Sequence, residues 1–242
     1  RIGQRTAFTT LGVLRRRAPL DHAIAKAAAR PLEQIDGAVL TAIRIGAYAL
    51  VYLDRIPDFA AVDTAVALVK EAGWAKAVGF ANGVLRKIAR ERSALLPPAP
   101  ATGDVEALSV FRSHPVWFTR RVVSRFGWDL ADALLAANNE PAATVLASWP
   151  AAGSAAALRA ALADDGVLVE ACRFVPEALR VVSGVPQRAK AFREGTFWIQ
   201  DEASQLAVLL FGHAVGPRVL DACAAPGGKT LALAARAAEG GL

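Results

Sequence analysis

The sequence has few of the residues that hold a secreted or membrane-bound protein together. Its two cysteines, Cys172 and Cys223, are too few for a disulfide framework and fit a reducing cytosol. The first residues do not show the pattern of a secretory signal peptide. The most apolar run, residues 38–53, is interrupted by Thr41 and Arg44, which indicates a buried helix rather than a membrane span. We therefore expect a cytoplasmic protein that has no membrane contact and no metal site.

Methionine is absent, and the chain runs from Arg1 to Leu242, so that it ends shortly after a glycine-rich loop. We expect from this that the chain is truncated. The composition that is present, 54% hydrophobic and 21% charged residues, is typical of a globular protein. The length is sufficient for one large domain or a few small ones. A net charge of +6 and a pI near 9.8 suit a nucleic-acid partner.

Residues 1–96 carry helical patterns, with apolar residues recurring every three to four positions. Pro31 is predicted to begin a helix, and the apolar pattern from Leu32 to Leu53 predicts that this helix is long and buried all round. A new pattern starts after Pro57, and Gly73 is predicted to end it. A last amphipathic helix follows, so that this part is predicted to form a compact helical bundle.

A stretch rich in proline and alanine, residues 95–103, predicts a spacer and the first domain boundary. Residues 104–187 are predicted to form a small α/β domain, and Ser154 is a candidate N-cap within it. Its expected helices lie at 105–111, 115–126, 130–137 and 154–164, and its expected strands at 144–149, 167–170 and 179–182. Residues 188–242 are assigned to a third domain.

Basic residues cluster on three predicted helices, at 15–17, 86–92 and 120–125. Two interpretations remain open for the clusters at 15–17 and 86–92: a surface that contacts phosphates, or solvated helix faces with cations near helix ends. The third cluster lies on a helix flanked by aromatic residues. Trp117 and Trp128 could likewise stack on bases, although tryptophan at helical spacing is more often part of a core. His114 could contact RNA, although a capping or packing role is favoured. Cys172 is interpreted as a buried thiol.

The stretch around residues 219–234 has the order strand, glycine loop and helix. Val219 and Leu220 are predicted to end a short buried strand, the first of a Rossmann-like sheet. The loop ends in Gly-Lys-Thr as a P-loop does, but Cys223 occupies the position of the first P-loop glycine, and the dinucleotide pattern is absent. Glycines let a loop turn sharply and approach a ligand closely, and a helix start adds free N–H donors. The alternative is a turn that needs glycines but binds nothing.

The string D-x-C-A-A-P-G-G-K-T at residues 221–230 resembles the first S-adenosylmethionine (SAM) motif of the RNA cytosine-C5 methyltransferases of the Nop/Sun family. Residues 195–205 resemble the block that precedes this motif, and their two acids, Asp201 and Glu202, are interpreted as helix-start residues rather than a catalytic pair. Residues 43–50 and 80–88 resemble the NusB family. Residues 114–118 and 136–141 resemble the connecting domain of Sun-type enzymes, but the following strand lacks the usual Arg and Asn.

The resemblance implies a multidomain α plus α/β protein: a NusB-like helical bundle (1–96), an α/β linker domain (104–187) and the start of a Rossmann-like methyltransferase domain (188–242). It implies that SAM is the cofactor and that the monomeric enzyme methylates cytosine C5 in small-subunit (16S) ribosomal RNA. The residues carried over for cofactor binding are Cys223, Ala224, Ala225, Pro226, Gly227, Gly228 and Lys229.

The resemblance also implies covalent catalysis by a cysteine thiolate that adds to C6 of the base. In the family this chemistry belongs to cysteines in Pro-Cys and Thr-Cys motifs, and neither dipeptide occurs in this sequence. We therefore expect no catalytic residue before Leu242 and no methyl transfer by the 242 residues alone. One alternative is a non-enzymatic RNA-binding or antitermination protein of the NusB type, which should end near residue 96. A P-loop NTPase is a third possibility.

Overall fold

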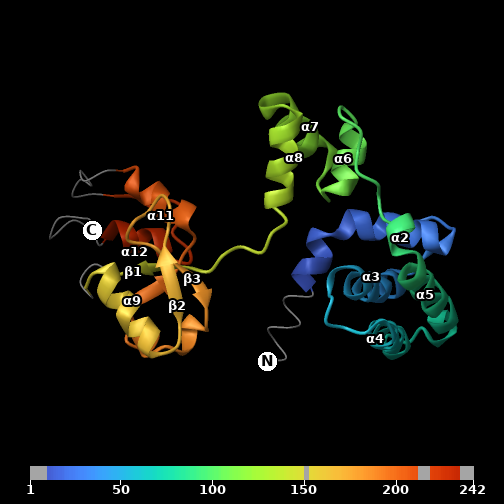
Figure 1. Ribbon diagram of the computed structural model, residues 1–242, viewed down its shortest axis with the longest axis horizontal. Coiled ribbons are helices and arrows are strands. Elements are labelled where there is room, and N and C mark those ends of the chain that lie inside the picture. Colours follow the sequence, from blue (N-terminus) through green and yellow to red (C-terminus); the bar gives the residue numbers. More distant parts are fainter. Residues whose placement is uncertain (1–9, 150–152, 212–218, 235–242) are drawn as a thin grey trace. The chain divides into compact units, whose positions relative to one another are not determined.

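A computed structural model of the protein describes residues 10–149, 153–211 and 219–234 (Figure 1). The backbone contacts divide the chain into two compact units, residues 1–140 and 141–242. The first unit is helical, and the second contains a small antiparallel sheet with helices. The expected combination of a helical bundle with α/β structure is confirmed.

The first unit contains seven helices whose bounds are described. Residues 10–15 are also helical, and short 3₁₀ turns lie at Leu32–Gln34 and Ala75–Ala77. The seven helices are α2 (Arg17–Ala28), α3 (Gly37–Tyr52), α4 (Asp58–Glu71), α5 (Val78–Leu95), α6 (Val105–Phe111), α7 (Val116–Phe126) and α8 (Trp128–Ala137).

Helix α3 is the centre of the core of the first unit, because α2, α4 and α5 all pack against it. Its buried residues lie on several faces, as the long apolar pattern predicted. The predicted start at Pro31 was wrong: only the 3₁₀ turn follows Pro31, and the helix begins at Gly37. The reason is the side chain of Asp36, which accepts a hydrogen bond from the Ala38 N–H at 2.8 Å and caps the helix there.

Gly46 lets α3 approach its neighbours closely. A Cβ atom at this position would lie 2.7 Å from the Ala65 Cβ on α4 and 2.9 Å from a Leu85 methyl on α5. Both distances are shorter than van der Waals contact, so the close spacing of these three helices depends on glycine. No helix in the described part of the chain is long and apolar enough to cross a membrane.

The backbone contacts group α6 to α8 with the first unit, and the domain bounds 104–187 inferred from the sequence stay a prediction. The Ser113 hydroxyl, just after α6, accepts a hydrogen bond from the Ala18 N–H on α2 at 3.1 Å. The Arg112 guanidinium donates two hydrogen bonds, at 2.6 and 2.7 Å, to the Asp132 carboxylate on α8. These contacts attach the three helices both to one another and to the bundle.

The second unit is built on an antiparallel sheet in the strand order β2-β3-β1-β4. A cluster of buried apolar residues, which includes Leu146 and Leu162, packs between the sheet and α9. Ser154 caps α9 as predicted, since its hydroxyl accepts from the Ala157 N–H. The elements are β1 (Val145–Ser148), α9 (Ala155–Asp164), β2 (Leu168–Ala171), β3 (Leu179–Ser183), a 3₁₀ turn (Pro186–Arg188), α10 (Lys190–Arg193), β4 (Phe197–Ile199), α11 (Glu202–Leu209) and α12 (Gly228–Ala234).

Strand β4 completes this sheet, although its residues had been assigned to a third domain. It pairs with β1 over three residues, with Ala147 opposite Trp198. A three-residue strand needs such a partner, because alone it would leave its backbone groups unpaired.

The strand predicted at Val219 and Leu220 is wrong for the described structure. These residues are not extended in a ladder, no described strand pairs with them, and Leu220 is 89% exposed. A strand of a parallel sheet is stable only when neighbouring strands and covering helices bury it.

Candidate functional site

The predicted cofactor residues form one continuous turn that leads into α12. Residues 222–226 are exposed, and Gly227 adopts a positive φ of 105°, which favours glycine. Leu231 donates the first helical hydrogen bond, to the Gly227 carbonyl at 2.8 Å. The N–H groups of Gly228, Lys229 and Thr230 precede that bond and are therefore free of helical acceptors.

Asp221 closes this turn from both sides, a role that sequence reasoning missed. One carboxylate oxygen accepts from the Cys223 N–H at 3.0 Å, and the other accepts from the Thr230 hydroxyl at 2.8 Å. The signal was present, because an Asp two residues before a turn N–H is a common way to fix such a turn. Since both oxygens of Asp221 are engaged, this residue shapes the loop rather than offering an acceptor to a ligand.

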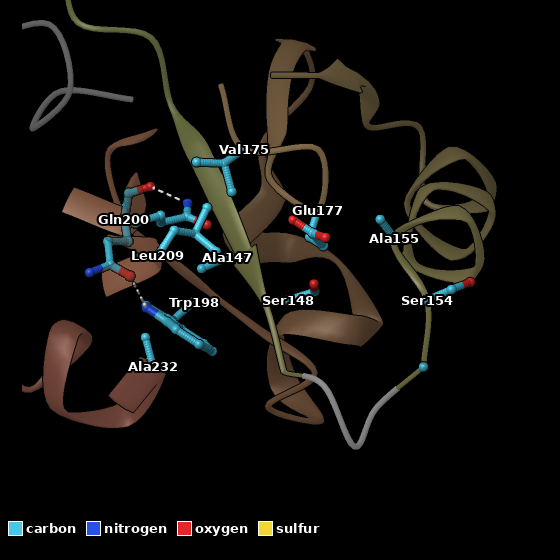
Figure 2. Close-up of a pocket in the computed structure, with 12 residues that line it drawn as sticks. Ala147, Ser148, Ser154, Ala155, Val175, Glu177, Trp198, Gln200, Leu209 and Ala232 are labelled. Atoms are coloured by element: carbon cyan, nitrogen blue, oxygen red, sulfur yellow. Dashed lines mark hydrogen bonds between the residues drawn. The ribbon is translucent and has the colours of Figure 1, made fainter. Parts of the chain in front are cut away.

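Trp198 and Gln200 lie beside Gly228 at the start of α12, which sequence reasoning also missed. The indole Nε1 of Trp198 donates to the Gln200 Oε1 at 3.0 Å, as Figure 2 shows. An indole N–H can only donate, so this bond fixes the amide orientation and directs the Gln200 Nε2 away from Trp198. A Cβ on Gly228 would lie 3.3 Å from that Nε2 and 3.5 Å from the Trp198 Nε1. A side chain at position 228 would therefore be crowded on this side.

The other side of the turn is open. A Cβ on Gly227 would meet no atom within 4 Å, and the exposed Lys229 side chain forms no ion pair with any described residue. The turn offers free N–H donors, an open side at Gly227 and the exposed Lys229 cation. Such a turn fits a ligand that carries a carboxylate and hydroxyl groups. The residues present therefore fit the cofactor that the sequence motif implies.

The two cysteines are both free and differ in exposure. Cys172 is half-buried rather than fully buried as expected, and burial, followed by the nearby Glu202 charge, raises the pKa of its thiol. Cys223 is exposed in the turn and has no histidine near it in sequence. The raised pKa of the Cys172 thiol is the opposite of what nucleophilic catalysis would require.

The acids of the preceding block have structural roles, as expected. Asp201 caps α11 by accepting from the Ala203 N–H at 2.8 Å. The Glu202 carboxylate accepts from the N–H groups of Phe174 and Val175, at 2.5 and 3.1 Å, and so fixes the loop between β2 and β3. In the parts of the chain that the structure describes, no group of three His, Cys, Asp or Glu residues could hold a metal ion.

A cavity of about 260 Å³ lies next to Trp198 in the second unit (Figure 2). Its walls are mainly apolar, and Gln200 and Gln205 are the buried polar residues beside it; the Gln205 amide donates to the Gln200 carbonyl at 2.9 Å. Ala232 of α12 is one of the residues that line the cavity. No set of charged groups converges on the cavity, and we assign no reaction to it.

The basic helices differ in how far their cations are already paired. On α5, Arg90 pairs with Glu91, Arg92 with Asp58, and Arg86 donates to Asn82. In the cluster at residues 15–17, Arg16 pairs with Glu140 and Arg17 with Asp21. On α7, Arg121 and Arg125 form no ion pair with a described residue.

The predicted role of His114 in packing is supported by its contacts. Its Nδ1 lies 2.6 Å from the Arg112 carbonyl, to which it donates, and its ring stacks on Phe118. By contrast, Trp117 is 65% exposed and is not a core residue, whereas Trp128 is half-buried.

Two parts of the chain match known domain families. Residues 5–90 match the NusB family, and residues 114–188 match the ferredoxin-like domain of the RsmF/B-like methyltransferases. The chain therefore has the domain arrangement of the Sun-type methyltransferases, and the resemblance stated from the sequence is confirmed.

The curated relatives that the chain matches include proteins named as ribosomal RNA methyltransferases. The chain is 31% identical to the "Probable ribosomal RNA small subunit methyltransferase B" of Bacillus subtilis, over 92% of this chain and 49% of that protein. It is 34% identical to ribosomal RNA small subunit methyltransferase B of Pseudomonas putida, over 93% of this chain and 50% of that protein. The chain thus spans about half the length of the curated relatives it matches.

A solved structure shares the fold. The crystal structure of PH0851 aligns with a TM-score of 0.73 and 21% identity, over 96% of this chain and 52% of that chain.

Proposed function

We propose that this chain supplies the RNA-binding part and the first SAM motif of a methyltransferase that acts on cytosine C5 of small-subunit ribosomal RNA. The observation that supports this most strongly is the order of three features in one chain: a NusB domain, an RsmF/B-like ferredoxin-like domain, and the turn at residues 221–230. A NusB-type RNA-binding protein without enzymatic function would not need the second and third features.

In this proposal the turn holds the methyl donor. The free N–H groups of Gly228 and Lys229 and the Lys229 ammonium would bind acceptor groups of SAM, and Gly227 would let the cofactor approach the backbone. When bound, SAM supplies the electrophilic methyl group. The roles of the chain's own residues are to bind and orient: Asp221 keeps the turn closed, and Gln200 packs beneath Gly228.

The nucleophile is assigned to a part of the enzyme outside these 242 residues. A thiolate must reach C6 of the target base, which has to leave its stack first. Cys223 lies in the turn proposed to hold the cofactor, and Cys172 is half-buried with a raised pKa. We therefore propose that the 242 residues alone transfer no methyl group.

Ligand binding and methyl transfer test this function separately. Isothermal calorimetry should detect binding of SAM, and no binding of ATP or GTP, to the chain or to a version that continues past Leu242. Gly228→Val should abolish SAM binding, because its branched side chain would collide with Gln200 and displace the turn that is proposed to hold the cofactor. The helical content of the first unit should remain unchanged in this variant.

Wild-type SAM affinity in Gly228→Val would remove this turn from the site. ATP binding in place of SAM would instead support the P-loop alternative. Transfer of labelled methyl from SAM to ribosomal RNA by residues 1–242 alone would contradict the assignment of the nucleophile.

A further inference from the structure

We propose that the exposed side of α7 is a binding surface for single-stranded RNA, on which Trp117 stacks with a base while Arg121 and Arg125 contact phosphates. This proposal rests on the proposed function, because it assigns the contact with RNA to particular residues. We call Trp117, Arg121 and Arg125 the α7 stripe.

The three residues share one side of the helix because they are spaced four positions apart. At 1.5 Å per residue, neighbouring members of the α7 stripe are separated by about 6 Å along the helix axis. The opposite side of α7 faces the interior, where Thr119 and Val122 are buried. The stripe therefore points away from the core of its unit.

Trp117 has the exposure and support of a stacking platform. It is 65% exposed, and Phe118 contacts it edge to face with ring centroids 5.7 Å apart. Phe118 in turn stacks on His114. This chain of aromatic contacts restricts the indole while leaving much of it accessible, so that little entropy is lost when a base stacks on it.

The charges around the stripe favour a polyanion. Helix α7 contains no acidic residue. Two acidic residues on the neighbouring helices form ion pairs, but with arginines outside the stripe. Glu106 pairs with Arg120, and Asp132 pairs with Arg112. Arg121 and Arg125 have no ion-pair partner among the described residues, so neither must break an ion pair before it contacts a phosphate.

A single strand fits this surface better than a duplex. In a duplex the bases are stacked inside, whereas an aromatic side chain on a convex helix can reach only bases that are already unstacked. An apolar protein partner would leave two unpaired arginines beside the contact, and burying them without partners is costly.

The test measures the affinity of the full 242-residue chain for a short fluorescein-labelled oligoadenylate across a range of salt concentrations. Trp117→Ala should weaken binding about tenfold at every salt concentration, with the salt dependence unchanged, because a base–aromatic stack is lost. Trp117→Phe should recover most of that loss. The double variant Arg121→Ala/Arg125→Ala should lower the slope of log affinity against log salt by about 1.4, since each single-strand phosphate contact contributes about 0.7.

Two matched controls keep the result specific. Trp74→Ala removes another exposed tryptophan, and Arg86→Ala/Arg90→Ala removes the same charge from α5, where both side chains have partners within the helix. Both controls should change affinity less than twofold. An RNA duplex of equal length should bind the wild type and Trp117→Ala equally.

Several results would overturn the proposal. If the α5 double variant loses as much affinity and slope as the α7 double variant, the attraction is general charge and the stripe is not the site. Lower thermal stability of Trp117→Ala with unchanged RNA affinity would identify the stripe as a packing surface for another part of the chain or for a protein. If the chain still binds SAM after either of these results, the proposed methyltransferase function stands. If the wild-type chain binds no RNA at any salt concentration, the result counts against both the α7 stripe and the proposed function.

Discussion

Replacing Gly46 or Gly83 by alanine adds the same methyl group to two helices of the first unit, with opposite expected effects on stability. Both glycines lie in segments that resemble NusB, and both have helical backbones. Glycine in a helix interior costs roughly 0.5–1 kcal/mol relative to alanine, so substitution alone should stabilise either helix by that amount. The room for the new methyl group then decides whether each substitution stabilises or destabilises the unit.

At Gly46 the new methyl group has no room. It would lie 2.7 Å from the Ala65 Cβ, which is fixed to the backbone of α4 and cannot rotate away. Helices α3 and α4 must therefore separate, and such overpacking costs roughly 1–3 kcal/mol. We expect Gly46→Ala to destabilise the unit by up to about 2.5 kcal/mol after the gain in helix propensity.

At Gly83 a Cβ would meet no atom within 4 Å, so only the gain in propensity remains. Gly83→Ala should stabilise by about 0.5–1 kcal/mol. Hydrogen exchange of peptides from α3 and α5, followed by mass spectrometry, reports the stability of this unit separately from the second. Changes of the same sign in both variants would refute the argument that Gly46 is a packing glycine.

Three further outcomes follow from the contacts described above. Asp132→Asn should lower the free energy of unfolding at neutral pH by about 1 kcal/mol. The hydrogen bond from Arg112 lowers the pKa of Asp132 in the folded protein. The stabilisation is therefore complete above the ordinary carboxyl pKa and disappears as the pH falls through the lowered pKa. Urea unfolding of variant and wild type should converge in acid, and a constant difference would contradict this. Glu202→Ala should speed amide exchange at residues 174–175, and unchanged protection there would show that the carboxylate does not fix the loop. In a version extending past Leu242, Cys223→Ser should retain methyl transfer, whereas complete loss with SAM binding intact would make this thiol the nucleophile.

Local sequence signals predicted the elements that local physics determines. Ser154 was identified as a cap because a hydroxyl before an apolar run can accept a backbone N–H, and it does so. Gly73 ends α4 with a positive φ of 87°. The start of α3 was misplaced because Pro31 and Asp36 are both valid start signals, and only the Asp36 side chain makes the capping bond to the following helix.

Sequence reasoning failed where an element depends on partners far away in the chain. Val219 and Leu220 have the composition of a buried strand, but a strand exists only if another strand accepts its hydrogen bonds, and none of the described strands does. The strand of Trp198 shows the same dependence on a distant partner: its residues were assigned to the third predicted domain, and in the structure it pairs with β1. Local composition cannot distinguish these cases, since the pairing partner is not part of the pattern.

The candidate site shows the same division between local and distant effects. The turn at residues 221–230 could be predicted because its glycines and small residues act on their own backbone. Its support by Gln200 could not, because that contact requires the Trp198 indole to orient the amide from a neighbouring strand. The exposure of a side chain also depends on distant parts of the chain. Trp117 and Trp198 are the same residue type, yet Trp117 is 65% exposed on α7, whereas the Trp198 indole donates a hydrogen bond to Gln200 beside the turn. The residues proposed to recognise RNA and to support the cofactor turn therefore emerge only when the packing of both units is known.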